Sequence, residues 1–201
     1  MRHQTVRRWP GRNAMSIALG AGAAALLLSA CGSDTPAPLP DSSDVVSGDA
    51  PLTAEQAQTV RTSGRELMQS VVDSVAPAGF TPKSTASYEE WSKCEAKSSG
   101  LNSGGNFNGV NYIADIWFEP ADEVPIDEVH NLLDSLPITW GEDQPDRGTS
   151  GVYWVHIQNT EPLRIIVGSP CYFLQDADDT GTIPNSAITE VTGFVSQDWG
   201  R

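Results

Sequence analysis

The chain has 201 residues, with 26 acidic side chains against 12 basic ones and a formal net charge of −14. Four of the arginines and none of the acidic residues lie in the first 30 positions, so the remaining 171 residues carry a net charge of −18. Such a surface repels nucleic acid and anionic lipid headgroups, which excludes a basic-groove nucleic-acid binder. The acidity also has a simpler explanation in solubility alone.

Residues 1–30 have the three parts of an export signal: an arginine-rich start, an apolar run over 17–28 and the small pair Ser29-Ala30. The apolar run is shorter than the roughly 20 residues that a membrane-spanning helix needs. Leu28-Ser29-Ala30-Cys31 is typical of a lipobox, and it predicts that Cys31 becomes the lipidated first residue of the mature chain. The alternative is an ordinary secretory signal followed by a chance cysteine.

A tether is predicted next, because residues 31–51 are rich in Ser, Asp and Pro and poor in large apolar side chains. We therefore expect a lipidated, disordered linker that holds the folded part away from the membrane. No internal repeat or second boundary follows, which leaves one globular domain over 52–174.

The first predicted element of the domain is an amphipathic helix. Thr53 and Gln56 form a capping-box pattern, apolar residues recur at helical spacing up to Val75, and Pro77 ends the helix. A stripe on one helix indicates packing against a core rather than a groove for an acyl ligand.

Strands are predicted on either side of a second helix. A weak strand covers 84–95, a strongly alternating one covers 110–118, and the helix runs from about 125 to 136. A hairpin of 152–158 and 163–174 follows. The order α-β-β-α-β-β predicts an α+β fold: an antiparallel sheet of about four strands with two helices packed on one face.

Cys94 and Cys171 remain once Cys31 is assigned to the anchor. An even pair of cysteines in an exported protein predicts a disulfide. The alternatives are free buried thiols, or a zinc site shared with His130 and His156, whose spacing is unlike that of structural zinc ligands.

The layout of these elements resembles a known family. Cys31, Cys94 and the run of residues 163–174, Leu-Arg-Ile-Ile-Val-Gly-Ser-Pro-Cys-Tyr-Phe-Leu, are similar to the mycobacterial LppA-type and related actinobacterial envelope lipoproteins. The resemblance implies a location at the cell envelope and a similar fold. It brings no catalytic residues to this chain.

Catalytic patterns are sparse in the sequence. His130 and His156 are the only histidines after the signal, and a hydrolase would need a carboxylate and a nucleophile within hydrogen-bond reach of one of them. There is no G-x-S-x-G elbow and no C-x-x-C pair. We therefore expect no catalysis and no cofactor.

Asp176, Asp178 and Asp179, followed by Gly181, imitate the start of a calcium loop. The twelfth position holds Ala187 in place of the bidentate glutamate. A solvated acidic turn is the favoured interpretation of this segment.

Aromatic residues offer a second kind of site. Trp117 and Trp154 lie on predicted strands and would form a contact surface if they face away from the helices; burial of both in the core is the favoured interpretation. The last segment, 175–201, is predicted to be an acidic tail that either packs on the domain or trails freely.

The sequence thus predicts a membrane-anchored, extracytoplasmic, non-catalytic binding or interaction module of the cell envelope. Its expected partners are the membrane, reached through the lipid anchor, and an envelope protein. One alternative is a carrier of an apolar or lipid ligand, and another is an envelope hydrolase.

Overall fold

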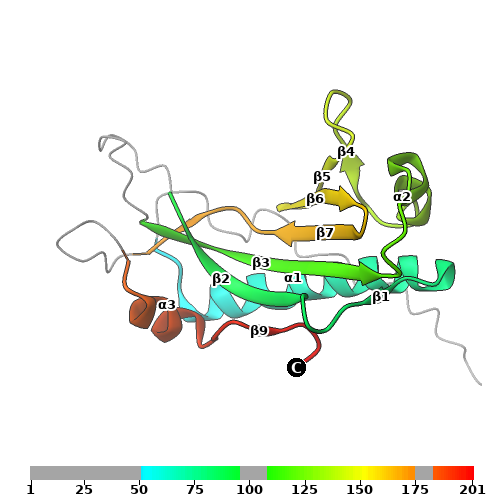
Figure 1. Cartoon of the computed structure of the whole chain (residues 1–201). Helices are drawn as coiled ribbons and strands as arrows, with labels where there is room; N and C mark the ends of the chain where they lie inside the picture. The colour runs from blue at the N-terminus through cyan, green and yellow to red at the C-terminus, as the bar shows by residue number, and fades with distance from the viewer. Residues whose placement is uncertain (1–50, 96–107, 175–182) are drawn as a thin grey trace, which may run out of the picture. The chain divides into compact units, whose positions relative to one another are not determined.

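A computed structural model describes residues 51–95, 108–174 and 183–201, all within one structural unit that spans Pro38–Arg201 (Figure 1). The predicted signal peptide, the lipidation site Cys31 and nearly all of the predicted tether lie outside the described residues. So do the three aspartates of the calcium candidate, Asp176, Asp178 and Asp179.

Helix α1 (Ala54–Val75) begins at the predicted capping box, in which the Thr53 and Gln56 side chains each accept a hydrogen bond from the other residue's backbone N–H. Its buried stripe faces the sheet, and a 3-10 turn, η1 (Ala76–Ala78), follows it. Gly64 lets the helix approach closely, because a side chain there would meet the Tyr112 ring at 2.7 Å. The Tyr153 hydroxyl donates a 2.8 Å hydrogen bond to the Val60 carbonyl, which joins α1 to the sheet.

One antiparallel sheet forms the rest of the unit, in the order β4-β5-β6-β7-β3-β2-β9, with β1 and β8 pairing with the two ends of β3. The long central strands are β2 (Tyr88–Cys94), β3 (Gly109–Glu119), β6 (Tyr153–Thr160) and β7 (Leu163–Gly168). The short strands are β1 (Thr81–Pro82), β4 (Thr139–Trp140), β5 (Arg147–Ser150), β8 (Tyr172–Phe173) and β9 (Gln197–Asp198). Two further helices, α2 (Ile126–Leu132) and α3 (Asn185–Thr192), both contact α1.

The prediction of about four strands and two helices was wrong, because the sheet has nine strands and the described residues contain three α-helices. Four of the five additional strands have only two residues and the fifth has four, too few for an alternating pattern to be visible. Two of the extra elements, α3 and β9, lie in the segment expected to be a tail. The four long strands and the hairpin between β6 and β7 lie where the sequence placed strands.

The two faces of the sheet differ in character. On the α1 side, Tyr112, Ala114, Ile116 and Phe118 of β3 are buried with apolar side chains from β6 and β7. The opposite side, which we call the open face, is formed by Tyr88 of β2, Ile113, Asp115 and Trp117 of β3, Trp154 and His156 of β6, and Arg164 and Ile166 of β7. Helix α1 lies behind the sheet from this side (Figure 1).

No helix within the described ranges is long and apolar enough to cross a membrane.

Candidate functional site

A charged pair is built into the open face. Asp115 lies on β3 and Arg164 on β7, and the Arg164 guanidinium donates two hydrogen bonds to the Asp115 carboxylate, from Nε at 2.9 Å and from a terminal nitrogen at 2.5 Å. Asp115 is only 1% exposed, so hydrogen bonds from the protein, these two among them, stabilise its charge in place of water. The bond to Asp115 raises the pKa of Arg164 above its usual value.

This pair holds an indole in place. The Arg164 guanidinium lies 4.5 Å from the centre of the Trp117 ring, which is cation–π geometry. Tyr88 joins the group from β2: burial, followed by the charge of Asp115 and the hydrogen bond to it, raises the pKa of the Tyr88 hydroxyl. Trp117 is thus part of a cross-strand group, Tyr88–Asp115–Arg164–Trp117, whose geometry is fixed before any partner arrives.

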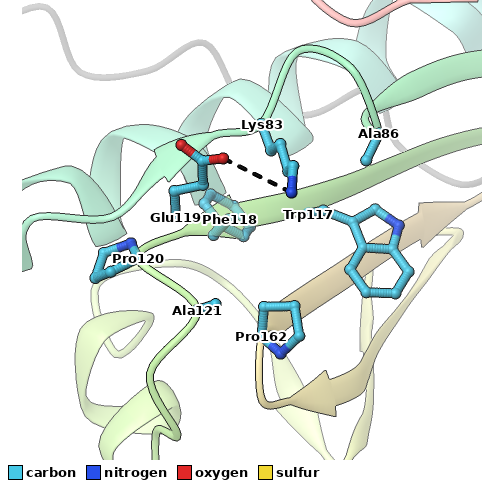
Figure 2. Close-up of a pocket in the computed structure, with 8 residues that line it drawn as sticks. All are labelled: Lys83, Ala86, Trp117, Phe118, Glu119, Pro120, Ala121 and Pro162. Carbon is cyan, nitrogen blue, oxygen red and sulfur yellow. Dashed lines mark ion pairs between the residues drawn. The ribbon is translucent and has the colours of Figure 1, made fainter.

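Trp117 also forms one wall of a surface hollow of about 450 Å³, which we call the Trp117 hollow (Figure 2). Its other apolar walls come from the end of β3 and from the turns around it: Ala86, Phe118, Pro120, Ala121 and Pro162. Lys83 and Glu119 supply its two charged groups, and their ammonium and carboxylate lie 3.8 Å apart. Six of the eight lining residues are therefore apolar, so the hollow suits an apolar side chain better than a polyhydroxylated ligand.

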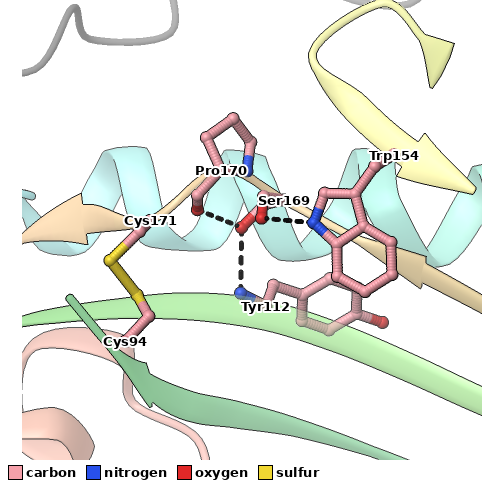
Figure 3. The surroundings of a disulfide bond; sticks show 6 residues. All are labelled: Cys94, Tyr112, Trp154, Ser169, Pro170 and Cys171. Carbon is pink, nitrogen blue, oxygen red and sulfur yellow. Dashed lines mark hydrogen bonds between the residues drawn. A yellow bond between two sulfur atoms is a disulfide. The ribbon is translucent and has the colours of Figure 1, made fainter. Parts of the chain in front are cut away.

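Trp154, the other tryptophan of the predicted contact surface, also lies on the open face. Its indole N–H donates a 3.1 Å hydrogen bond to the Ser169 carbonyl (Figure 3). Its ring covers Gly168, where even a single added carbon would lie 2.1 Å from the indole. Both predicted residues are partly exposed. They take part in different contacts, since only Trp117 lines the hollow.

The disulfide prediction is confirmed: Cys94 at the end of β2 is bonded to Cys171, the residue before β8, with an S–S distance of 2.04 Å (Figure 3). The zinc alternative is thereby wrong, because both sulfurs are consumed in the bond. Next to it, the Ser169 hydroxyl accepts a hydrogen bond from the Tyr112 N–H at 2.9 Å and donates one to the Pro170 carbonyl.

The two histidines lie in different surroundings. His130 is stacked on Trp140, with ring centres 4.4 Å apart, and its Nε2 lies 2.7 Å from the Pro145 carbonyl. His156 on the open face pairs with the Asp146 carboxylate at 3.2 Å. Within the described part of the chain, neither ring is hydrogen-bonded to a hydroxyl or thiol.

Metal-ligating residues do not gather in the regions that the structure describes, where no three His, Cys, Asp or Glu side chains form a cluster able to hold an ion. Ala187, the twelfth position of the calcium candidate, lies in α3 and is buried.

A second buried carboxylate lies on the α1 side of the sheet. Glu89 of β2 is fully buried and accepts hydrogen bonds from the Tyr112 hydroxyl at 2.8 Å, Gln197 at 3.0 Å, Arg61 at 2.8 Å and Arg65. Burial raises the pKa of Glu89, but the hydrogen bonds from Gln197, Tyr112 and Arg61 outweigh it and hold the pKa below its ordinary value. Phe194 and Trp199 complete the cluster, since they stack on Arg61 and Arg65 at 4.0 and 5.1 Å.

Sequence reasoning selected Trp117 but not Asp115 and Arg164, the pair that holds it. The sequence does contain a feature that could have indicated this pair, because Asp115 and Arg164 each interrupt an otherwise apolar strand, where a charged residue is unusual. What the sequence does not give is the register, which places Trp117 opposite Arg164 and so brings the two charges together.

Comparison with known proteins adds no assignment: no protein-family model, no curated protein and no solved structure matches this chain.

Proposed function

We propose that this protein is a non-catalytic, lipid-anchored interaction module of the cell envelope, which contacts a partner protein through the open face around Trp117. The lipobox and the apolar segment before it support export and anchoring at Cys31. The layout of Cys31, Cys94 and residues 163–174, which resembles that of LppA-type lipoproteins, implies the same location. Two acyl chains on the mature N-terminus would provide stable attachment without a membrane-spanning helix.

The observation that carries the contact surface is the preorganised group Tyr88–Asp115–Arg164–Trp117. Tyr, Trp and Arg are the residue types that contribute most of the energy at protein interfaces. Here they lie on a sheet face with α1 on its other side. Arg164 and Tyr88 are held by bonds to Asp115, and Trp117 is held by the Arg164 guanidinium over its ring. Binding therefore requires little loss of side-chain entropy, which favours affinity.

The Trp117 hollow supports the choice of a protein as the partner. An apolar side chain of the partner fits against Trp117, Pro120 and Pro162. Polar groups of the partner around that side chain then contact Lys83 and Glu119. An apolar anchor within a polar rim is the usual anatomy of a protein interface. The carrier alternative expects its ligand between the helices and the sheet, but the space beneath α1 is filled by buried side chains.

Site-specific photocrosslinking tests this function. A benzophenone amino acid at exposed Ala121, inside the hollow, is expected to capture a defined partner when the full-length protein is irradiated in its native cells. Adding Trp117→Ala to the same protein removes the apolar wall and the Arg164 contact, so the crosslink yield should fall at least tenfold. Adding Trp140→Ala, which removes an indole that does not line the hollow, should leave the yield unchanged.

Position 69 supplies the second control, because Gln69 lies on the exposed side of α1. The benzophenone placed there should not capture the same partner. The proposal fails if Trp117→Ala leaves the yield unchanged, or if position 69 gives the same adduct as position 121. Replacing Cys31 with serine tests the anchor separately: the protein should move from the membrane fraction to the soluble fraction.

A further inference from the structure

The outer edge of the sheet at β2 is only partly paired. Strand β9 lies antiparallel to β2, with Asp198 opposite Tyr88 and Gln197 opposite Glu89. If β9 continued in this register, Val195 would lie opposite Trp91. In the described residues the pairing stops at Gln197, so β2 from Trp91 to Cys94 has a neighbouring strand on the β3 side alone.

The backbone of this free edge points outward at alternate residues. The N–H and C=O of Tyr112 are both bonded to Ser169, away from β2, so Tyr112 and Trp91 form a non-hydrogen-bonded pair. The N–H and C=O of Trp91 therefore point away from β3. The Ser87 carbonyl accepts a 2.9 Å hydrogen bond from the Trp199 N–H, so Ser87 also directs its backbone away from β3. Lys93 lies two residues after Trp91 in the same strand, so its N–H and C=O point in the same direction.

A groove of about 450 Å³ runs along these residues, and we call it the edge groove. One wall is β2 from Glu90 to Lys93. The other wall is formed by α3 and the turn that precedes β9: Asn185, Ile188, Thr189, Phe194, Val195 and Ser196. Val195 is 68% exposed, and within the ranges that the structure describes no other large hydrophobic side chain is exposed. The groove thus combines outward-pointing backbone groups with an apolar side chain that has little cover.

We propose that the edge groove binds an extended segment of a partner polypeptide, which adds to β2 as an antiparallel strand in line with β9. This site is separate from the Trp117 hollow and does not depend on the function proposed for it. Main-chain hydrogen bonds to Trp91 and Lys93 supply the affinity, as in other complexes in which a peptide extends a sheet. The protein's own β9 shows that this edge accepts an antiparallel strand.

Charge adds a preference for the occupant. Lys93 is the only basic residue that lines the groove, while Glu90 already accepts a 3.2 Å hydrogen bond from the Ser196 hydroxyl. Because directly opposed residues share a sheet face, an acidic residue opposite Lys93 is favoured there. Charged side chains along a sheet edge also discourage pairing between two copies of the same chain. The occupant is therefore a segment of another protein.

The test uses an acetylated, amidated hexapeptide of the sequence Thr-Val-Thr-Glu-Thr-Val as the probe, titrated into the isotope-labelled, disulfide-bonded protein. In the antiparallel register of β9, its glutamate lies opposite Lys93 and its last valine opposite Trp91, so the peptide stops short of β9. We expect the amide signals of Trp91, Lys93 and Val195 to shift with saturation. Two N-methylated versions of the peptide separate backbone pairing from other contacts. Methylation of the amides that face β2 should weaken binding at least tenfold, whereas methylation of the alternate amides should leave binding largely unchanged.

Protein variants give an independent check. Lys93→Pro removes the outward N–H but no hydrogen bond to β3, so it should abolish the shifts. Lys93→Ala keeps that N–H, so it should bind the peptide with roughly threefold lower affinity. A peptide with Lys in place of Glu should bind the wild-type protein with a similar loss of affinity. The N-methylated peptides make the result independent of whether Lys93→Pro folds.

Three results would overturn the proposal. One is the absence of any shift at millimolar peptide, and another is equal binding of both N-methylated peptides. The third is a wild-type dimer in light scattering that Lys93→Pro converts to a monomer, because the edge would then be occupied by a second copy.

Discussion

The Gln197 side chain donates a 3.0 Å hydrogen bond to the buried Glu89 carboxylate, although the two residues are 108 positions apart in the chain. This bond joins the last strand of the sheet to the charge cluster beneath α1. The same cluster receives Arg61 and Arg65 from the helix. Glu89 is therefore the point at which helix, sheet and C-terminal segment are held together.

The first prediction concerns the pH dependence of stability. The folded-state pKa of Glu89 lies below the ordinary value of 4.5, so near and below that pH the unfolded chain binds more protons than the folded one. The stability that Glu89 contributes is fully present above about pH 4.5 and is lost as the pH falls through the folded-state pKa. Glu89→Gln should lower the free energy of unfolding by about 3 kcal/mol at pH 7, because it leaves two arginines without their charge partner.

Urea denaturation at pH 7, 5, 4 and 3 measures this effect. The difference between wild type and Glu89→Gln should be constant down to about pH 5 and shrink below pH 4.5. Glu90→Gln is the matched control, since its side chain is partly exposed and lies on the other face of the same strand. A difference that stayed the same at every pH would contradict the depressed pKa.

The second prediction concerns the disulfide. Cys94 and Cys171 are separated by 77 positions, and the chain-entropy relation for a loop of this size gives about 4–5 kcal/mol of stabilisation, with a mechanism that is model-dependent. The double variant Cys94→Ser/Cys171→Ser should unfold at a correspondingly lower urea concentration, with the slope of the transition increased or unchanged. An unchanged midpoint would show that the unfolded chain is not restrained by this bond.

The parts of the fold that the sequence predicted are those with long periodic patterns. Helix α1 shows a stripe over six turns and a capping box, and β3 alternates over residues 110–118, so both elements were found. Strands such as β8 and β9 exist because a long neighbour offers backbone partners to a two-residue segment. No local pattern of two residues records such a partner, so the strand count was too low.

The parts of the candidate site differ in the same way. Alternation along β3 placed Trp117 on the opposite face from Tyr112, and the structure has this arrangement. The hollow beside Trp117 depends on Lys83, Pro120 and Pro162, which come from three separate turns and meet only after folding. The edge groove likewise depends on where β9 stops pairing. Sequence periodicity contains no information about such an endpoint.

The third prediction tests the close packing of an indole on a glycine. Gly168→Ala would place a carbon 2.1 Å from the Trp154 ring, so the ring must move and its hydrogen bond to the Ser169 carbonyl must break. We expect a loss of about 2–3 kcal/mol from overpacking and the lost bond. Chemical denaturation measures the loss, and Gly168→Ala combined with Trp154→Ala should recover part of it. Absence of recovery would mean that Trp154 is not the obstructing group.

The last prediction links the buried pair on the open face to binding. Asp115→Asn keeps the shape of the side chain but removes the charge that holds Arg164, so the guanidinium is no longer fixed over Trp117. Breaking such a pair should cost about 3 kcal/mol of stability. The indole should also gain mobility, seen as a lower fluorescence anisotropy in a variant in which Trp117 is the only tryptophan near this face.

Asp146→Asn is the matched control, because Asp146 is also paired with a side chain of the open face, His156, but is 41% exposed. Its loss should change the free energy of unfolding by less than about 1 kcal/mol and leave Trp117 unaffected. If Asp115→Asn folds but the crosslink from position 121 persists at full yield, the preorganisation of Trp117 by Arg164 is not needed for binding. If the yield falls while the Asp146→Asn protein retains it, the buried carboxylate acts on the partner through Arg164 and Trp117, since Asp115 itself is almost inaccessible to any ligand.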